Sequence, residues 1–163
     1  MLWVLGWLVL AQCLVSLLGA WRWLAFIRRA PRGRSDYAPP LSLMVPCRGS
    51  EPGLEENLAA YGRQDYPDYE LVLVTSGPDD PASAVARAIP GARLLWAAPR
   101  NDEGEKVTKL RAAAGALRPS SEVLVFADSD GRPPACWLRE LVAPLARPEA
   151  EVGATTGYRW YVP

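Results

Sequence analysis

Asp128 and Asp130 are the residues whose type and spacing point most directly to chemistry, and they follow an apolar run from Val123 to Phe126. β-Branched and aromatic residues without a polar break are typical of a strand buried on both faces of a parallel sheet. Open α/β sheets bind ligands at the carboxyl ends of their strands, where both acids would lie. Two hard oxygen donors with a small serine between them suit a divalent cation that carries a diphosphate. The alternative is a polar turn, since Asp, Ser and Gly are ordinary turn residues.

The absence of histidine restricts the chemistry that is open to this sequence. Without histidine there is no Ser-His triad and no imidazole to act as an acid, a base or a metal ligand. Proton transfer and metal binding therefore fall to carboxylates. The three cysteines, Cys13, Cys47 and Cys136, are widely spaced and form no CxxC pair, which fits a reducing compartment better than a disulfide framework.

Length and charge limit the domain organisation and the partners. At 163 residues, half of them hydrophobic, the chain is long enough for one domain with a core and one appendage. The formal net charge is zero, but the segment up to Pro40 has five arginines and one aspartate, which leaves 13 basic and 17 acidic residues after it. A mildly acidic globular part argues against nucleic acid as a partner.

The segment from Leu2 to Trp21 is almost wholly apolar, and charged residues follow it rather than precede it. Twenty helical residues rise about 30 Å, which is the thickness of a bilayer core. A signal peptide, the competing interpretation, has charges ahead of its apolar run and a small-residue cleavage site behind it. Here arginines follow, and the positive-inside rule keeps such a flank in the cytoplasm. We therefore predict a retained membrane anchor over residues 1–27 and a cytoplasmic globular domain.

Strand and helix patterns alternate along the rest of the chain. A basic, proline-containing linker over residues 28–40 leads into a domain predicted for residues 41–163. Strands are expected at 41–45, 70–75, 92–97, 123–126 and 151–156, and helices at 54–61, 82–88, 105–117 and 135–146. Pro81 favours the first position of its helix, with Asp79 or Asp80 as the N-cap. The alternation predicts an α/β fold, with a mostly parallel sheet and the 123–126 strand at its centre.

Four motifs in a fixed order carry a resemblance to a known family. They are VPCRGSEPGLEENLAAYGRQDYP, ELVLVTSGPDDPA, GEKVTKL and VLVFADSD. With the apolar amino-terminal segment, they are similar to the amino-terminal half of processive, family-2-like inverting glycosyltransferases with the Rossmann-like GT-A fold. Within this family, the sequence most resembles the ceramide glucosyltransferase-like branch. The resemblance implies transfer of a hexose, with glucose favoured, from a UDP-sugar to a lipid or another hydroxyl acceptor, with Mg²⁺ or Mn²⁺ as the cofactor.

The resemblance assigns roles to individual acids. Asp80 matches an aspartate that contacts the uridine, and Asp79 is the alternative because the two are adjacent in this loop. Asp128 matches the first acid of the family's metal motif and Asp130 matches the second. The resemblance implies that Asp130 reaches the divalent ion, while Asp128 reaches the ribose or a metal-bound water.

Lys106 matches a position where the family brings a cation to the nucleotide. It offers a point charge to a phosphate or a hydrogen bond to the base, near the positive end of its helix. The alternative is a solvent-exposed lysine on an amphipathic helix, which is our expectation for Lys109. Arg48 and Glu51 follow the first strand, where the family cups the nucleoside, and no direct contact is expected from them.

The chain departs from the resembled family after the fifth predicted strand. The family has a general base and a later Arg-Trp motif near the acceptor, and we expect both beyond Pro163. Tyr158, Arg159 and Trp160 resemble a stretch that follows the fifth strand in bacterial relatives, where it lines the acceptor side or anchors a strand end. A non-catalytic nucleotide-sugar-binding module is therefore the alternative function. A nucleotidyltransferase is less favoured, because PCRGSEPG is not a basic, glycine-rich phosphate loop.

Overall fold

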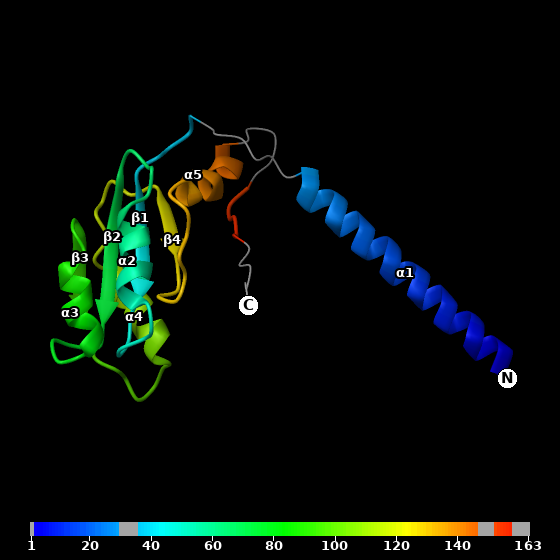
Figure 1. The fold of residues 1–163 in the computed structure, drawn as a ribbon, viewed down its shortest axis with the longest axis horizontal. Coiled ribbons are helices and arrows are strands. Elements are labelled where there is room, and N and C mark those ends of the chain that lie inside the picture. Colours follow the sequence, from blue (N-terminus) through cyan, green and yellow to red (C-terminus); the bar gives the residue numbers. More distant parts are fainter. Residues whose placement is uncertain (1, 30–35, 147–151, 158–163) are drawn as a thin grey trace. The chain divides into compact units, whose positions relative to one another are not determined.

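The computed structural model describes residues 2–29, 36–146 and 152–157 of a chain with two compact units, Met1–Gly33 and Arg34–Pro163 (Figure 1). The first unit contains helix α1 (Leu2–Arg29). The most apolar stretch of its Trp3–Phe26 segment has a mean hydropathy of 1.9 and no buried residue, so the helix is long and apolar enough to cross a membrane. Because a signal sequence has the same length and composition, membrane anchoring stays a prediction.

The second unit is an α/β domain built on one parallel sheet. Its strands are β1 (Leu41–Pro46), β2 (Tyr69–Thr75), β3 (Ala92–Trp96) and β4 (Val123–Phe126). They lie in the order β3-β2-β1-β4, and each pairing is parallel (Figure 1). The helices are α2 (Leu54–Gly62), α3 (Pro81–Ala88), α4 (Glu105–Ala114) and α5 (Trp137–Val142), with a 3₁₀ helix at Ala143–Ala146. The predicted class, a mostly parallel sheet with flanking helices, is confirmed.

The side chains of β1 alternate between two hydrophobic clusters, one on each face of the sheet. Leu41, Leu43 and Val45 pack with residues of α2, α3 and α5 on one face. Met44 packs with residues of β2 and α4 on the other face. All four side chains are fully buried, and such burial stabilises by roughly 1.5–3 kcal/mol each. Because β1 is enclosed on both faces, the start of the loop at its carboxyl end is held firmly in place.

β4 lies at an edge of the described sheet, where it pairs with β1. Val125 is buried, but Leu124 is 45% exposed and Phe126 is 56% exposed. Phe126 is in register with Met44 and therefore points to the face that α4 covers, yet α4 packs chiefly on β1, β2 and β3. Among the strands that the structure describes, the prediction of a central strand buried on both faces is therefore wrong. An apolar run shows that a strand can be buried, but it does not show which neighbours flank it.

Two predicted helices end earlier in the structure. α4 ends at Ala114, where Gly115 is the C-cap. α5 ends at Val142 and is continued by the 3₁₀ helix as far as Ala146. Pro144 lies in this last turn, and its missing amide hydrogen disfavours continuation of the α-helical hydrogen bonding.

The prediction of a fifth strand over residues 151–156 is wrong for the part of that segment that the structure describes. Residues 152–156 contain no strand, and Glu151 lies outside the described residues. The Thr155 hydroxyl instead donates a hydrogen bond to the Leu141 carbonyl oxygen of α5 at 2.7 Å. This stretch is rich in small and polar residues, so it offers little apolar surface for a sheet face to bury. The predicted YRW motif at 158–160 also lies outside the described residues.

Candidate functional site

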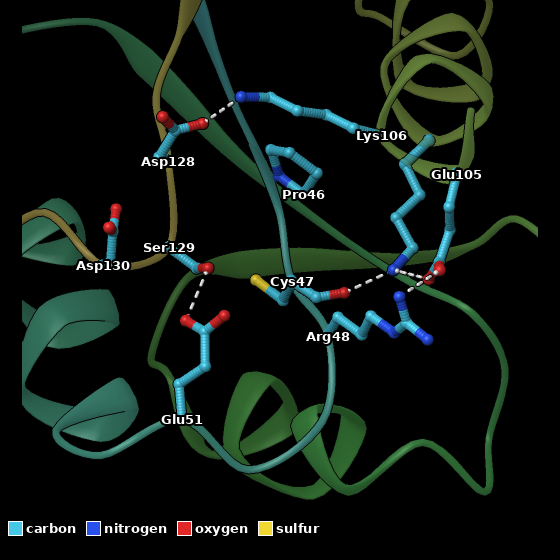
Figure 2. A pocket seen from close by; sticks show the side chains of 10 residues that line it. Pro46, Cys47, Arg48, Glu51, Glu105, Lys106, Asp128, Ser129 and Asp130 are labelled. Atoms are coloured by element: carbon cyan, nitrogen blue, oxygen red, sulfur yellow. Dashed lines mark hydrogen bonds and ion pairs between the residues drawn. The ribbon is translucent and has the colours of Figure 1, made fainter.

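A cavity of about 310 Å³ lies at the carboxyl ends of β1 and β4, beside the first turns of α4 (Figure 2). Open α/β sheets bind their ligands at this edge. The lining comes from three segments: the end of β1 and the loop after it (Pro46, Cys47, Arg48, Glu51), the start of α4 (Glu105, Lys106, Lys109) and the loop after β4 (Asp128, Ser129, Asp130). The structure thus brings together three of the residues that were singled out from sequence, namely Lys106, Asp128 and Asp130.

Lys106 and Asp128 face one another within this cavity. Lys106 Nζ donates a hydrogen bond to Asp128 Oδ1, and the two form an ion pair (Figure 2). Both side chains are at least half exposed, 61% for Lys106 and 50% for Asp128. Exposed ion pairs contribute about 0–1 kcal/mol, so this pair can open at little cost.

Ser129 and Asp130 complete the acidic loop that follows β4. The Ser129 hydroxyl donates a hydrogen bond to Glu51 Oε2 at 3.0 Å. Asp130 is exposed in the cavity lining, and its carboxylate stands apart from the Lys106–Asp128 pair (Figure 2). Glu51, from which no direct nucleotide contact is expected, therefore ties the loop after β1 to the acidic loop.

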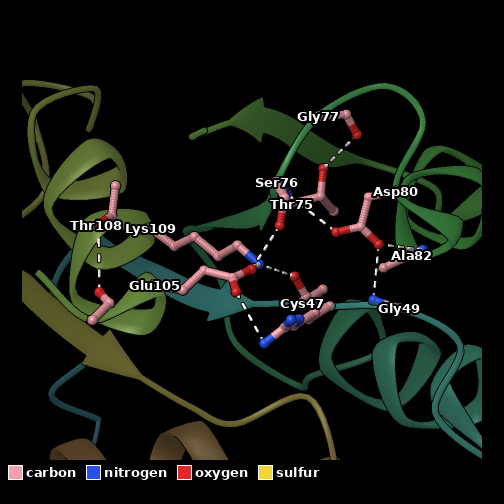
Figure 3. A network of polar contacts seen from close by, with 12 residues as sticks. Cys47, Gly49, Thr75, Ser76, Gly77, Asp80, Ala82, Glu105, Thr108 and Lys109 are labelled. Carbon is pink, nitrogen blue, oxygen red and sulfur yellow. Dashed lines mark hydrogen bonds and ion pairs between the residues drawn. The ribbon is translucent and has the colours of Figure 1, made fainter. Parts of the chain in front are cut away.

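Lys109 is buried beside the cavity, with 2% of its surface exposed. Its ammonium donates to the Cys47 carbonyl oxygen at 2.6 Å and to Glu105 Oε1 at 2.7 Å (Figure 3). A buried ammonium needs such partners, because desolvation without them is costly. The prediction of a solvent-exposed Lys109 is wrong. The signal in the sequence was a glutamate four residues before the lysine, but such pairs are also common on exposed helix faces.

Glu105 connects three segments around the cavity. Besides the bond from Lys109, it accepts a hydrogen bond from Ser76 Oγ at 2.7 Å (Figure 3) and pairs with Arg48 Nη1 at 3.1 Å (Figure 2). The hydrogen bonds from Lys109 and Ser76 hold the pKa of Glu105 below its ordinary value. The ionised carboxylate thereby ties the loops after β1 and β2 to the first turn of α4.

Asp80 is the N-cap of α3, and Pro81 follows it in the first helical turn, as predicted. Its carboxylate accepts hydrogen bonds from the backbone amides of Gly49 at 2.8 Å, Ala82 at 3.0 Å and Ser76 at 3.2 Å (Figure 3). Burial raises the pKa of Asp80, but the hydrogen bonds together outweigh burial and hold this pKa below its ordinary value. Asp80 therefore braces the loops after β1 and β2.

A second hollow, of about 520 Å³, lies over the loop that follows β2. Residues 76–81 line it together with Arg48 and Gly49. Asp79 is exposed here and Asp80 is partly buried, so neither lines the cavity of the acidic loop. Arg48 lines both the hollow and the cavity, which makes them neighbours.

The donor set fits a hard divalent cation that takes its other ligands from a substrate and from water. In the ranges that the structure describes, no group of three His, Cys, Asp or Glu side chains is placed to hold a metal. Asp128 and Asp130 nevertheless bring two carboxylates to one cavity, and the Lys106 ammonium already places a positive charge against the first. Mg²⁺ typically keeps several waters and binds one or two carboxylates plus substrate phosphates.

Two residues of α2 that the sequence analysis did not single out also contact the acidic loop. Asn57 Nδ2 donates to the Ser129 carbonyl oxygen at 3.2 Å, and Tyr61 Oη donates to the Asp128 carbonyl oxygen at 2.9 Å. In the sequence, an asparagine within the apolar stripe of α2 could have indicated such a contact, because a buried amide requires hydrogen-bond partners.

The parallel sheet and the similarity to solved glycosyltransferase structures give this domain the GT-A fold. The chain belongs to glycosyl transferase family 21, whose sequence pattern matches residues 1–158. The resemblance to GT-A glycosyltransferases is thereby confirmed, and the ceramide glucosyltransferase-like branch stays a prediction.

Solved structures of three other proteins are similar to this chain. The mannosyltransferase PcManGT from Pyrobaculum calidifontis, in complex with GDP-Man and Mn²⁺, has a TM-score of 0.59 and 27% identity, over 81% of this chain and 40% of that one. Glucosyl-3-phosphoglycerate synthase from Mycobacterium tuberculosis, with Mn²⁺, UDP and glucosyl-3-phosphoglycerate, has a TM-score of 0.56 and 24% identity, over 73% and 47%. TarS from S. aureus, with UDP-GlcNAc, has a TM-score of 0.51 and 22% identity, over 65% and 31%. This chain therefore spans less than half the length of each, and the last two similarities show the fold alone.

Proposed function

We propose that this chain is the donor-binding part of a membrane-anchored, metal-dependent glycosyltransferase. A hexose, with glucose as the favoured sugar, passes from a UDP-sugar to a lipid or another hydroxyl acceptor with inversion at the sugar. The observation that carries the proposal is the meeting of Lys106, Asp128 and Asp130 in one cavity at the carboxyl edge of the sheet. Two carboxylates suit a divalent cation, and a cation beside a lysine suits a diphosphate.

Asp128 and Asp130 are the residues that would hold Mg²⁺ or Mn²⁺ next to the donor diphosphate. When bound, the ion neutralises negative charge on the diphosphate leaving group. In this proposal Asp130 would contact the ion directly, and Asp128 would help to hold it through a metal-bound water or would meet the ribose. The Mn²⁺ in the PcManGT and glucosyl-3-phosphoglycerate synthase structures supports a divalent ion in this fold.

Lys106 supplies a second positive charge to the diphosphate. Its exposed pairing with Asp128 opens at little cost, so the ammonium is able to turn toward a phosphate once Asp128 engages the donor. Lys106 lies in the first turn of α4, where the backbone dipole also favours a negatively charged group. The cation, the lysine and the helix terminus then act on the same diphosphate.

The hollow over the loop after β2 is the proposed place of the nucleoside. Asp80 is proposed to contact the uridine, with Asp79 as the alternative. Three backbone amides fix the orientation of the Asp80 carboxylate and keep it ionised at neutral pH, which leaves it an acceptor for a ligand hydroxyl or imide. Asp79 is more exposed and lies in the same hollow.

The proposed sugar, acceptor and membrane location rest on the similar structures, the family resemblance and helix α1. GDP-Man, UDP and UDP-GlcNAc occur in the similar structures, which supports a nucleotide-sugar donor without selecting its base or sugar. Glucose and a lipid acceptor follow from the resemblance to the ceramide glucosyltransferase-like branch. The length and composition of α1, with arginines after its apolar segment, support an anchor whose domain faces the cytoplasm.

A non-catalytic nucleotide-sugar-binding module is the second candidate function. Deprotonation of an acceptor hydroxyl requires a carboxylate as general base, since the sequence has no histidine. Glu51 accepts a hydrogen bond from Ser129, and Glu105 is bound by Lys109. The other acids among the cavity-lining residues are the two assigned to the metal. This arrangement favours binding without transfer for the described part of the chain by itself.

Calorimetric titration of UDP into the whole chain in detergent tests the proposed function. We expect UDP to bind at least about tenfold more tightly with Mn²⁺ than with EDTA, because the two acids would hold an ion that neutralises charge on the diphosphate. The control variant is Glu140→Gln, which removes an exposed carboxylate from α5, outside the cavity lining, and should show the same Mn²⁺ dependence of UDP binding. Identical affinities with Mn²⁺ and with EDTA would contradict the metal role.

A further inference from the structure

Helix α2 reaches the acidic loop through two side chains on the same helical face. Asn57 and Tyr61 are four residues apart, and both are almost fully buried, at 7% and 3% exposure. The Tyr61 hydroxyl donates to the Asp128 carbonyl oxygen, and the Asn57 amide donates to the Ser129 carbonyl oxygen, at 2.9 and 3.2 Å. Two consecutive backbone carbonyls of the acidic loop are therefore bound from one side by one helix.

These bonds begin where the hydrogen bonds of the sheet end. β4 ends at Phe126, and the amide of Ala127 makes one more bond to β1, to the Met44 carbonyl oxygen at 3.1 Å. Beyond this point the loop turns, and the Gly131 amide donates to the Asp128 carbonyl oxygen at 3.3 Å. A turn held by its own long backbone bond is weakly defined, so the α2 side chains add a restraint on its backbone to the side-chain contacts of Ser129 with Glu51 and of Asp128 with Lys106.

The orientation of the Asn57 amide is itself determined. Arg132 Nε donates to Asn57 Oδ1 at 3.1 Å, and this arginine also lies near Glu56 Oε2 at 3.7 Å. Because the guanidinium has only donors, the oxygen of the Asn57 amide must face it and the amide nitrogen must face Ser129. Arg132, which follows the acidic loop by two positions, thus contacts α2 and holds the Asn57 amide in the orientation that binds the Ser129 carbonyl oxygen.

We propose that Asn57 and Tyr61 are positioning residues that aim the Asp128 and Asp130 carboxylates into the cavity. Each peptide unit is planar, so the two bonds hold the peptide planes on both sides of Ser129 and thereby restrict the directions open to the Cα–Cβ bonds of Asp128 and Asp130. The inference rests on the proposed function, in which these carboxylates serve a divalent ion and the donor diphosphate. Neither α2 side chain lines the cavity, and both act through the loop backbone.

Tyr61→Phe isolates this role, because it removes one hydroxyl and keeps the buried ring. The matched control is Tyr66→Phe, since the buried Tyr66 hydroxyl donates to the Pro39 carbonyl oxygen at 2.8 Å and lies outside the cavity lining. Each variant loses one buried hydroxyl-to-carbonyl hydrogen bond, so both should lower the melting temperature of the whole chain by similar amounts. If Tyr61 had only a structural role, Tyr61→Phe and Tyr66→Phe would give the same result in every other measurement.

UDP titrations into the whole chain in detergent, with Mn²⁺ and with EDTA, separate positioning from stability. We expect Tyr61→Phe to weaken UDP binding about tenfold with Mn²⁺ and to leave UDP binding with EDTA within about twofold, since supports of metal ligands carry effects of this size. Tyr66→Phe should match the unmodified chain in both titrations. Equal Mn²⁺-dependent affinities for Tyr61→Phe and Tyr66→Phe would overturn the inference, as would an equal loss with Mn²⁺ and with EDTA.

A second variant covers the case in which Tyr61→Phe does not fold. Asn57→Asp keeps an oxygen for Arg132 but replaces the amide donor that faces the Ser129 carbonyl, so it should also weaken the Mn²⁺-dependent binding. Unchanged Mn²⁺-dependent affinity in this variant would overturn the inference. Absence of Mn²⁺-dependent UDP binding in the unmodified chain would instead overturn the proposed function, and the positioning role with it.

Discussion

Lys106 of α4 and Asp128 of the acidic loop are joined by an ion pair although 22 residues separate them in the sequence. The ammonium pairs with one oxygen of a carboxylate that lines the cavity, and a divalent cation would be drawn to the same carboxylate (Figure 2). Lys106 and a metal ion therefore compete for the same acid, whereas Lys106 and a diphosphate attract one another.

Lys106→Met should consequently have opposite effects on two ligands. We expect Mn²⁺ alone to bind about threefold more tightly, because a competing cation is removed, and UDP with EDTA to bind about threefold more weakly. Calorimetry with the whole chain measures both. Arg63→Met is the control, since it removes an exposed positive charge at the C-cap of α2, outside the cavity lining, and should change neither affinity. Weaker Mn²⁺ binding in Lys106→Met would contradict the competition.

Lys109→Met should act on stability, in contrast to the neighbouring lysine. Its removal takes a buried donor from the Cys47 carbonyl oxygen and from Glu105, so we expect a loss of about 2–4 kcal/mol in the free energy of unfolding. Lys106→Met should cost less than about 1 kcal/mol, because its ion pair is exposed. Urea unfolding of both variants provides the comparison, and equal costs would show that the burial of Lys109 has little energetic consequence.

The order of elements and the place of the acids were predictable from the sequence because both depend on local patterns. Pro81 after an aspartate indicates a helix start, and the apolar run before Asp128 indicates a strand that ends at the acids. Both expectations agree with the structure. The GT-A class was also predictable, because four motifs in order constrain the chain more strongly than any single motif.

The remaining features depend on contacts between residues far apart in the sequence. The edge position of β4 depends on which strands pair, and Val125 and Phe126 differ in burial because α4 packs chiefly on other strands. The contact of Tyr61 with Asp128 joins residues 67 positions apart. The burial of Lys109 likewise requires a carbonyl oxygen 62 positions away, which no helical periodicity reports.

Asp80 should make stability depend on pH in the acidic range. Its folded-state pKa lies below the ordinary value of about 3.9, so its contribution is fully present above that value and is lost as pH falls through the folded pKa. Asp80→Asn keeps an N-cap acceptor and should cost about 1 kcal/mol or less at pH 7. Melting temperatures from pH 7 to about pH 2 should fall less steeply for Asp80→Asn than for the unmodified chain. Parallel curves would show that Asp80 does not contribute to the pH dependence of stability.

A reporter fused after Pro163 tests the membrane orientation. If residues 1–27 span the membrane and the arginines after them stay inside, the reporter should be active in the cytoplasm and silent outside. Replacement of these arginines by glutamine is the matched control, because it keeps the apolar segment and should weaken the preference for this orientation. Reporter activity outside the cell membrane, or cleavage near Ala20, would reject a retained anchor.

Asp130→Asn tests the central claim most directly, with Asp128→Asn and Glu140→Gln measured beside it. Asn keeps the shape and one oxygen but loses the charge, so Asp130→Asn should abolish sugar transfer by the whole protein, and Asp128→Asn should also weaken donor binding. Both acids are exposed, so the free energy of unfolding should change by about 0.5 kcal/mol or less. The decisive measurement is Mn²⁺-dependent UDP affinity together with melting temperature for Asp130→Asn. We expect Asp130→Asn to lose the Mn²⁺-dependent affinity at an unchanged melting temperature, and an Mn²⁺-dependent affinity equal to that of the unmodified chain would reject Asp130 as a metal ligand.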